Sequence, residues 1–197
     1  GNDAAFYASP LFMESIESSD QDKKWDTEDL WNYEYTTGPP VVNVRAISFL
    51  GPEAFDGVLA ERLSENIIYE MGEWKTHEKV DNERGIYIPL DIASATGAEV
   101  GDNLDKLTFT YTYERSLPGA MEDEDCPGEI IEGEEYRLMY CQVKMSLENV
   151  TILGIYEPWP QGNPVLAANP IYTTWTLLSD EQQITLIDKD HVYLGIT

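Results

Sequence analysis

The side chains that could act as nucleophiles or bases are few in this sequence of 197 residues. It contains two histidines, His77 and His191, and two cysteines, Cys126 and Cys141. A nucleophilic hydrolase places its nucleophile beside a base, often on a G-x-S-x-G turn, and the sequence has no such turn. The phosphate-binding loop G-x-x-x-x-G-K-[ST] is missing too. We therefore expect neither enzyme activity nor an ATP site in this chain.

Carboxylates are abundant, with 37 acidic residues, and could in principle bind a metal ion. Asp20, Asp22 and Asp26 bring hard oxygen ligands together, as does the cluster at 122–125. Neither cluster has the central glycine and closing glutamate of an EF-hand loop. We weigh calcium for these clusters but predict no cofactor, and we expect most carboxylates to be solvated surface charge.

The two cysteines leave two interpretations open. A bond between Cys126 and Cys141 would close a loop of fifteen residues and add about 3 kcal/mol of stability by chain entropy. Two unpaired thiols are the alternative, because spacing alone does not show that the Cα atoms are close enough. Without a supporting histidine or cysteine cluster, they make a poor zinc site.

Exposed tryptophans could contact a partner, although most tryptophans are core residues. Trp159 lies between Pro158 and Pro160 in a predicted loop, where an aromatic ring more often faces a partner. We take Trp159, and with it Trp74, as the candidate partner surface.

The net charge of −25 opposes binding to nucleic acid, which we exclude as a partner. No stretch approaches the roughly 18 apolar residues of a membrane span; the best, 41–50, is interrupted by Asn43 and Arg45. The sequence begins Gly-Asn-Asp with no initiator Met and no leader, so we expect a piece of a longer protein.

The clearest pattern is a strand, a short helix, a turn and a strand within residues 86–113. Alternation at 86–88 predicts a strand that stops at Pro89, where a helix with an apolar side begins. Gly97 can end that helix in a left-handed conformation, and Gly101-Asp102 forms a turn before the alternating strand at 107–113.

Other segments are assigned from similar patterns. Residues 1–40 are acidic, and the spacing of Leu11, Phe12 and Ile16 predicts a helix in a lead-in segment. We predict a strand at 41–50, a helix at 51–63 and an exposed acidic insert at about 115–135. Strands are predicted at 136–145, 150–156, 171–178, 184–187 and 191–196, with a tight turn at Glu148-Asn149.

Two segments, IYIPLDIASATGAEVGD at 86–102 and VTILGIYEP at 150–158, resemble the extracytoplasmic domain of FtsX-like (MacB-like) ABC-transporter permeases. In that family a strand, a small-residue helix, a "GxxVGD" turn and a strand precede a later strand that returns beside them. The family's "Gly-Arg" element is matched poorly, because Met71-Gly72-Glu73-Trp74 has no arginine.

The resemblance implies an α+β fold, with a strand-helix lobe and a mostly antiparallel β lobe like a MacB-like periplasmic core domain. Residues 1–40 would be the membrane-proximal lead-in and 41–197 the extracytoplasmic domain of a permease in the cell membrane. The implied role is non-catalytic coupling of ATP-driven membrane-helix movement to export or to control of an extracytoplasmic partner.

The implied partners are the protein's own transmembrane helices, a separate cytoplasmic ATPase that carries the ATP, and either a second permease copy or an extracytoplasmic protein. The alternative function is a secreted or lipid-anchored bacterial binding module that holds carbohydrate or peptide on exposed aromatic rings.

Overall fold

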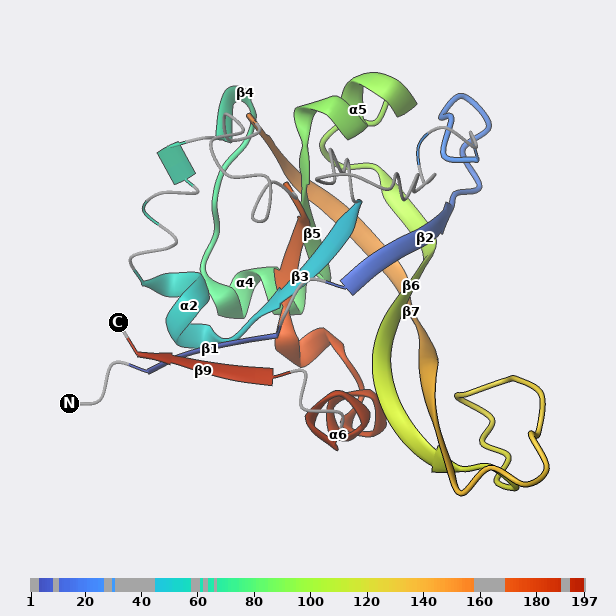
Figure 1. Ribbon diagram of the computed structural model, residues 1–197. Coiled ribbons are helices and arrows are strands. Elements are labelled where there is room, and N and C mark those ends of the chain that lie inside the picture. Colours follow the sequence, from blue (N-terminus) through green and yellow to red (C-terminus); the bar gives the residue numbers. More distant parts are fainter. Residues whose placement is uncertain are drawn as a thin grey trace.

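Six strands close into a β-barrel in the computed structural model (Figure 1). The structure describes residues 4–8, 11–26, 30, 45–57, 61, 64–65, 67–157, 169–188 and 192–196. In spatial order the barrel strands are β2 (Leu11–Glu17), β6 (Asn103–Pro118), β7 (Tyr136–Tyr156), β5 (Gly85–Pro89), β8 (Ile171–Thr174) and β3 (Ala46–Leu50).

The ring closes because β2 pairs with β3 as well as with β6. Leu11 lies opposite Ile47 in the first pair, and Ile16 lies opposite Leu107 in the second. The pairs β5–β7 and β3–β8 are parallel, and the other pairs of the ring are antiparallel. Three further strands add to the ring: β4 (Ile67–Gly72) pairs with β7, β1 (Ala4–Ala8) pairs with β3, and β9 (Val192–Ile196) pairs with β1.

Apolar side chains from all six barrel strands form one buried cluster. Met13, Ile47, Ile88 and Phe109 are each fully buried in it. Removing this apolar surface from water is the main favourable contribution to folding, at about 25 cal/mol per Å². The barrel is therefore a packed core.

The fold class predicted from the sequence is wrong. The α+β arrangement of a strand-helix lobe beside an antiparallel lobe is replaced by a closed barrel, to which strands of both predicted lobes contribute. The helices are short additions: α2 (Pro52–Asp56), α4 (His77–Asn82), α5 (Leu90–Thr96), a 3-10 turn η1 (Trp175–Leu177) and α6 (Asp180–Asp188). Local patterns identified several strands correctly, but pairing between distant strands decides whether a sheet closes.

The helix predicted around Leu11, Phe12 and Ile16 is also wrong, because these residues form β2. A register shift between Met13 and Ser15 lets Leu11, Met13 and Ile16 all be buried on a strand. An apolar spacing that suits a helix thus arises from a bulged strand. Part of the segment predicted as a membrane-proximal lead-in therefore forms a strand of the barrel.

The strand predicted at 184–187 is wrong as well, because these residues lie within α6. The Ser179 hydroxyl accepts from the Gln182 backbone N–H at 3.2 Å, and the Gln182 side chain accepts from the Ser179 N–H at 2.9 Å. This reciprocal capping box starts the helix. The predicted strand at 191–196 is confirmed as β9 over the described residues.

The longest element is the hairpin of β6 and β7, of 16 and 21 residues. Its pairing runs in one register from Lys106↔Glu148 to Pro118↔Tyr136. β7 is continuous, so the turn predicted at Glu148-Asn149 is wrong, although Asn149 does have a positive φ of 53°. The far end of the hairpin projects beyond the barrel (Figure 1).

Candidate functional site

The strand-helix-turn unit forms as the sequence predicts. Pro89 ends β5 and caps α5, and Gly97 ends α5 with φ of +77°. Gly101 also has a positive φ, +94°, which favours glycine in this turn. The carboxylate of Asp102 accepts from the Glu99 N–H at 2.9 Å. These residues shape a backbone corner.

A lysine that the sequence analysis did not single out holds this corner. Lys23 Nζ donates to the Gly97 carbonyl at 2.8 Å and lies 3.2 Å from Glu99 and 3.4 Å from Asp102. Its side chain is only 12% exposed. Lys23 therefore joins the segment after β2 to the turn before β6. A partner so distant in sequence leaves no local signal.

The end of β7 returns beside β5 in parallel, with Ile86 opposite Ile152 and Ile88 opposite Ile155. Gly154 lies against the ring of Tyr87, where an added Cβ would be 2.8 Å from Cδ1. The glycine of the GIYE segment is thus required by packing. The contact between Gly154 and Tyr87 joins the two segments that carry the family resemblance.

Trp74, one of the two candidate contact residues, is half-buried in an aromatic cluster. Its ring stacks on Phe55 at 4.4 Å and on Tyr87 at 4.5 Å between centroids. Its indole N–H donates to the Phe55 carbonyl at 3.0 Å. The structure gives Trp74 a packing role. Trp159 lies outside the described residues.

The tyrosines around this cluster are held in the neutral form. Burial raises the pKa of Tyr87 and of Tyr172 to about 12, and burial raises the pKa of Tyr156 well above its ordinary value. The Tyr87 hydroxyl donates to the Glu73 carbonyl at 2.9 Å and accepts from the Lys75 N–H at 2.8 Å. Such groups anchor a core at neutral pH.

The histidines and the first acidic cluster were weighed for chemistry, and no catalytic or metal site was predicted from them. His77 is buried edge-on against Phe55, and its backbone N–H donates to Asp56, while His191 lies outside the described residues. The Asp20 carboxylate accepts from the Asp22 N–H in a local turn. Within the part of the chain that the structure describes, no three His, Cys, Asp or Glu side chains come together as metal ligands would.

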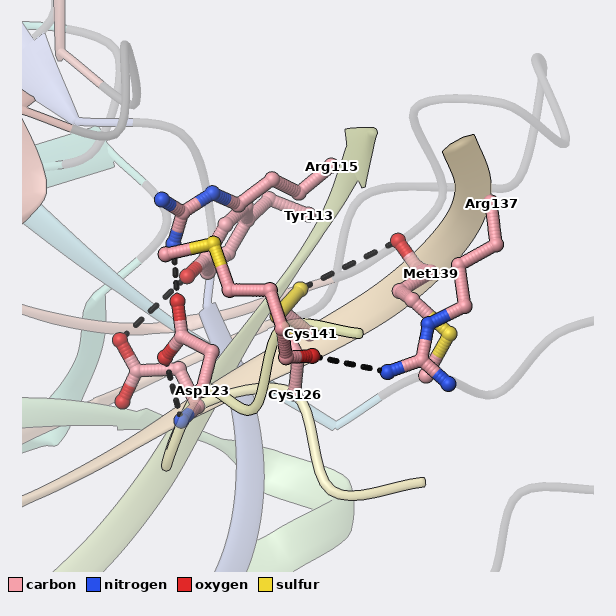
Figure 2. Close-up of a disulfide and its surroundings, with 9 residues drawn as sticks. Tyr113, Arg115, Asp123, Cys126, Arg137, Met139 and Cys141 are labelled. Atoms are coloured by element: carbon pink, nitrogen blue, oxygen red, sulfur yellow. Dashed lines mark hydrogen bonds and ion pairs between the residues drawn. A yellow bond between two sulfur atoms is a disulfide. The ribbon is translucent and has the colours of Figure 1, made fainter. Parts of the chain in front are cut away.

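The outer end of the β6–β7 hairpin is the most distinctive surface. A disulfide joins Cys126 to Cys141 (Figure 2), so the first of the two interpretations of these cysteines holds. The bond fastens the acidic insert to β7, and the Gln142 N–H donates to the Asp125 carbonyl at 2.7 Å beside it. The predicted insert is a loop at 119–135 folded back on its own hairpin.

This loop covers one face of the hairpin. Arg115 pairs with Asp123, and the Tyr113 hydroxyl bonds to Asp125 at 3.3 Å (Figure 2). Arg137, 7% exposed, donates to the Met121 carbonyl at 2.9 Å. Leu117 is buried with the disulfide. All the hairpin residues on this side have odd numbers, as the twofold alternation of a strand requires.

The opposite face carries the even-numbered residues and is not covered by the loop; we call it the bare face. Tyr136, Leu138 and Tyr140 are 64%, 61% and 64% exposed. Their cross-strand partners Pro118, Ser116 and Glu114 are exposed too. This surface was not predicted from the sequence, because both faces of YRLMYC contain apolar residues. The position of Cys141 was the available signal, since a disulfide to the loop fixes which face is covered.

None of the helices that the structure describes is both long and apolar enough to span a bilayer. A scan against protein-family models finds no match, and a search of curated proteins finds no similar one.

Proposed function

We propose that this chain is a non-catalytic extracytoplasmic domain of an ABC-type permease of the FtsX-like class. The observation that carries the proposal is the contact between the two resembling segments. β5, α5 and the Gly101-Asp102 turn lead into β6, and the ILGIY end of β7 returns beside β5, with β4 on its other side. This is the order and adjacency that the resemblance requires.

The α+β architecture is not part of this proposal, since the barrel replaces it. What remains is a local unit in the wall of the barrel, where β7 pairs with both β5 and β6. The disulfide supports a location outside the cytoplasm, because disulfides persist mainly in oxidising compartments.

The proposed role is mechanical coupling. Movement passed from membrane helices to an outside partner needs contacts that differ between two states and needs no reactive side chain. A rigid barrel with a long projecting hairpin suits that role, because a small rotation of the barrel displaces the hairpin tip over a larger distance.

The test uses the complete protein encoded by the gene. We expect apolar spans of about 20 residues on both sides of this domain and, after detergent extraction, co-purification with an ATPase subunit or an attached ATPase domain. A lone secretory leader before the domain, with the protein recovered from the soluble fraction, would instead establish the secreted binding module.

A further inference from the structure

The bare face of the β6–β7 hairpin tip has the composition of a contact surface. Tyr136, Leu138 and Tyr140 are the three most exposed large apolar side chains of the described residues. Alternate residues on a strand are about 7 Å apart, so the three form a stripe about 14 Å long. Tyrosine is among the residues that contribute most to protein interfaces, and contiguous exposed apolar side chains mark interaction sites.

The stripe is held in place before any partner arrives. On the covered face, the disulfide and the Arg115 to Asp123 ion pair fix the loop to the strands. The paired strands leave the three side chains with little backbone freedom. A preorganised surface loses less entropy on binding, which favours affinity.

The charge around the stripe selects the partner. The loop at 121–135 has eight acidic residues and no Lys or Arg, and Glu114 lies across from Tyr140 on the bare face. Of the two arginines of the tip, Arg115 pairs with Asp123, and Arg137 is buried on the covered face, where it donates to the Met121 carbonyl. Because the loop lies against the covered face, the negative charge at the border of the stripe comes from Glu114 and from the two acids next to Tyr136 in the chain. These two acids are Glu134 and Glu135.

This charge selects against two other occupants. A second copy would bring another acidic loop and another net charge of −25 to the same contact. An anionic lipid surface would be repelled in the same way. A protein segment with Lys or Arg around apolar residues complements both the stripe and its border.

We propose that the face formed by Tyr136, Leu138 and Tyr140 is the docking site for a basic, partly apolar segment of another protein. The tyrosine rings also suit arginine, whose guanidinium stacks on aromatic faces. This inference concerns the hairpin tip and holds whether or not the domain belongs to a permease.

The test measures fluorescence anisotropy of short labelled peptides with the disulfide-bonded protein at physiological ionic strength. Three probes are compared: alternating lysine and leucine, alternating lysine and serine, and alternating glutamate and leucine. We expect the lysine-leucine peptide to bind at least about tenfold more tightly than either of the others, since losing either the apolar contact or the charge attraction removes a comparable share of the binding energy.

The site is located with variants. The triple change Y136S, L138S and Y140S should weaken lysine-leucine binding about tenfold, because truncating interface anchors commonly has this effect. The matched control is I184S with I187S on α6, whose side chains are 57% and 50% exposed. It should leave the affinity unchanged. Should the triple variant fail to fold, L138S alone is expected to weaken binding about threefold.

Equal binding of the lysine-leucine and lysine-serine peptides would overturn the proposal, because net charge alone would then explain binding. Equal losses in the triple variant and the α6 control would do the same. A tip-dependent dimer, or tip-dependent binding to zwitterionic vesicles with no peptide binding, would assign the face to a second copy or to a membrane and also reject it.

Discussion

Cys126 of the acidic loop is bonded to Cys141 of β7, and this bond decides which face of the hairpin is covered. Leu117 is buried beside it, while Leu138, on the other side of the same ribbon, is 61% exposed. One covalent link thus creates both a small satellite core and a bare apolar stripe.

Replacing Cys126 and Cys141 together with serine should lower the free energy of unfolding by about 3 kcal/mol, because the fifteen-residue loop is no longer closed in the unfolded chain. Urea unfolding with and without reductant measures the effect. The native protein should lose stability on reduction, whereas the double serine variant should not respond. A native protein with the same unfolding midpoint under both conditions would contradict the expectation.

Gly154→Ala should destabilise the barrel by about 1–3 kcal/mol. The new Cβ would lie 2.8 and 2.9 Å from two atoms of the Tyr87 ring, which is held by its hydroxyl and stacked on Trp74. Chemical unfolding of the two proteins gives the difference.

Gly128→Ala is the matched control for that substitution. Its Cβ would meet only the flexible end of Met139, at 2.5 Å from Cε, and that end can move aside. We expect a change within about 0.5 kcal/mol. Equal costs at Gly154 and Gly128 would show that the rigid ring of Tyr87 is not what excludes a side chain at Gly154.

The local unit around α5 could be predicted because its signals are local. Pro89 stops the strand, and Gly97 takes the left-handed conformation that the sequence analysis expected. Closure of the barrel could not be predicted in this way, since it depends on Leu11 pairing with Ile47 across a long separation in sequence. That pairing overrides a helical spacing, as tertiary context often overrides local propensity.

The contact surface likewise depends on tertiary structure that local sequence signals do not reveal. Tryptophan content directed attention to Trp159 and Trp74, yet Trp74 is stacked within the fold. The exposed stripe is made of tyrosine and leucine on a strand whose two faces look alike in sequence. Only the folded position of the acidic loop distinguishes Leu138 from Leu117.

Ser179→Ala should lower the free energy of unfolding by about 1 kcal/mol, because the Gln182 N–H loses its capping partner at the start of α6. Ser179→Asp is the matched control, since aspartate caps comparably and its charge suits a helix N-terminus. Thermal unfolding followed by circular dichroism compares the variants. A stability of Ser179→Asp as low as that of Ser179→Ala would contradict the capping role.

Stability should fall as pH rises from about 10 to about 12. Burial raises the pKa of Tyr87 and Tyr172 from 10 to about 12, so between these values the unfolded chain loses protons that the folded chain keeps. Proton release on unfolding makes the free energy of unfolding decrease with pH. Urea unfolding across this range, with tyrosinate absorbance recorded in parallel, measures both effects. Tyr172→Phe keeps the ring but removes one titrating group, so its stability should decline less steeply. A decline as steep as in the native protein would show that Tyr172 is not one of the groups responsible.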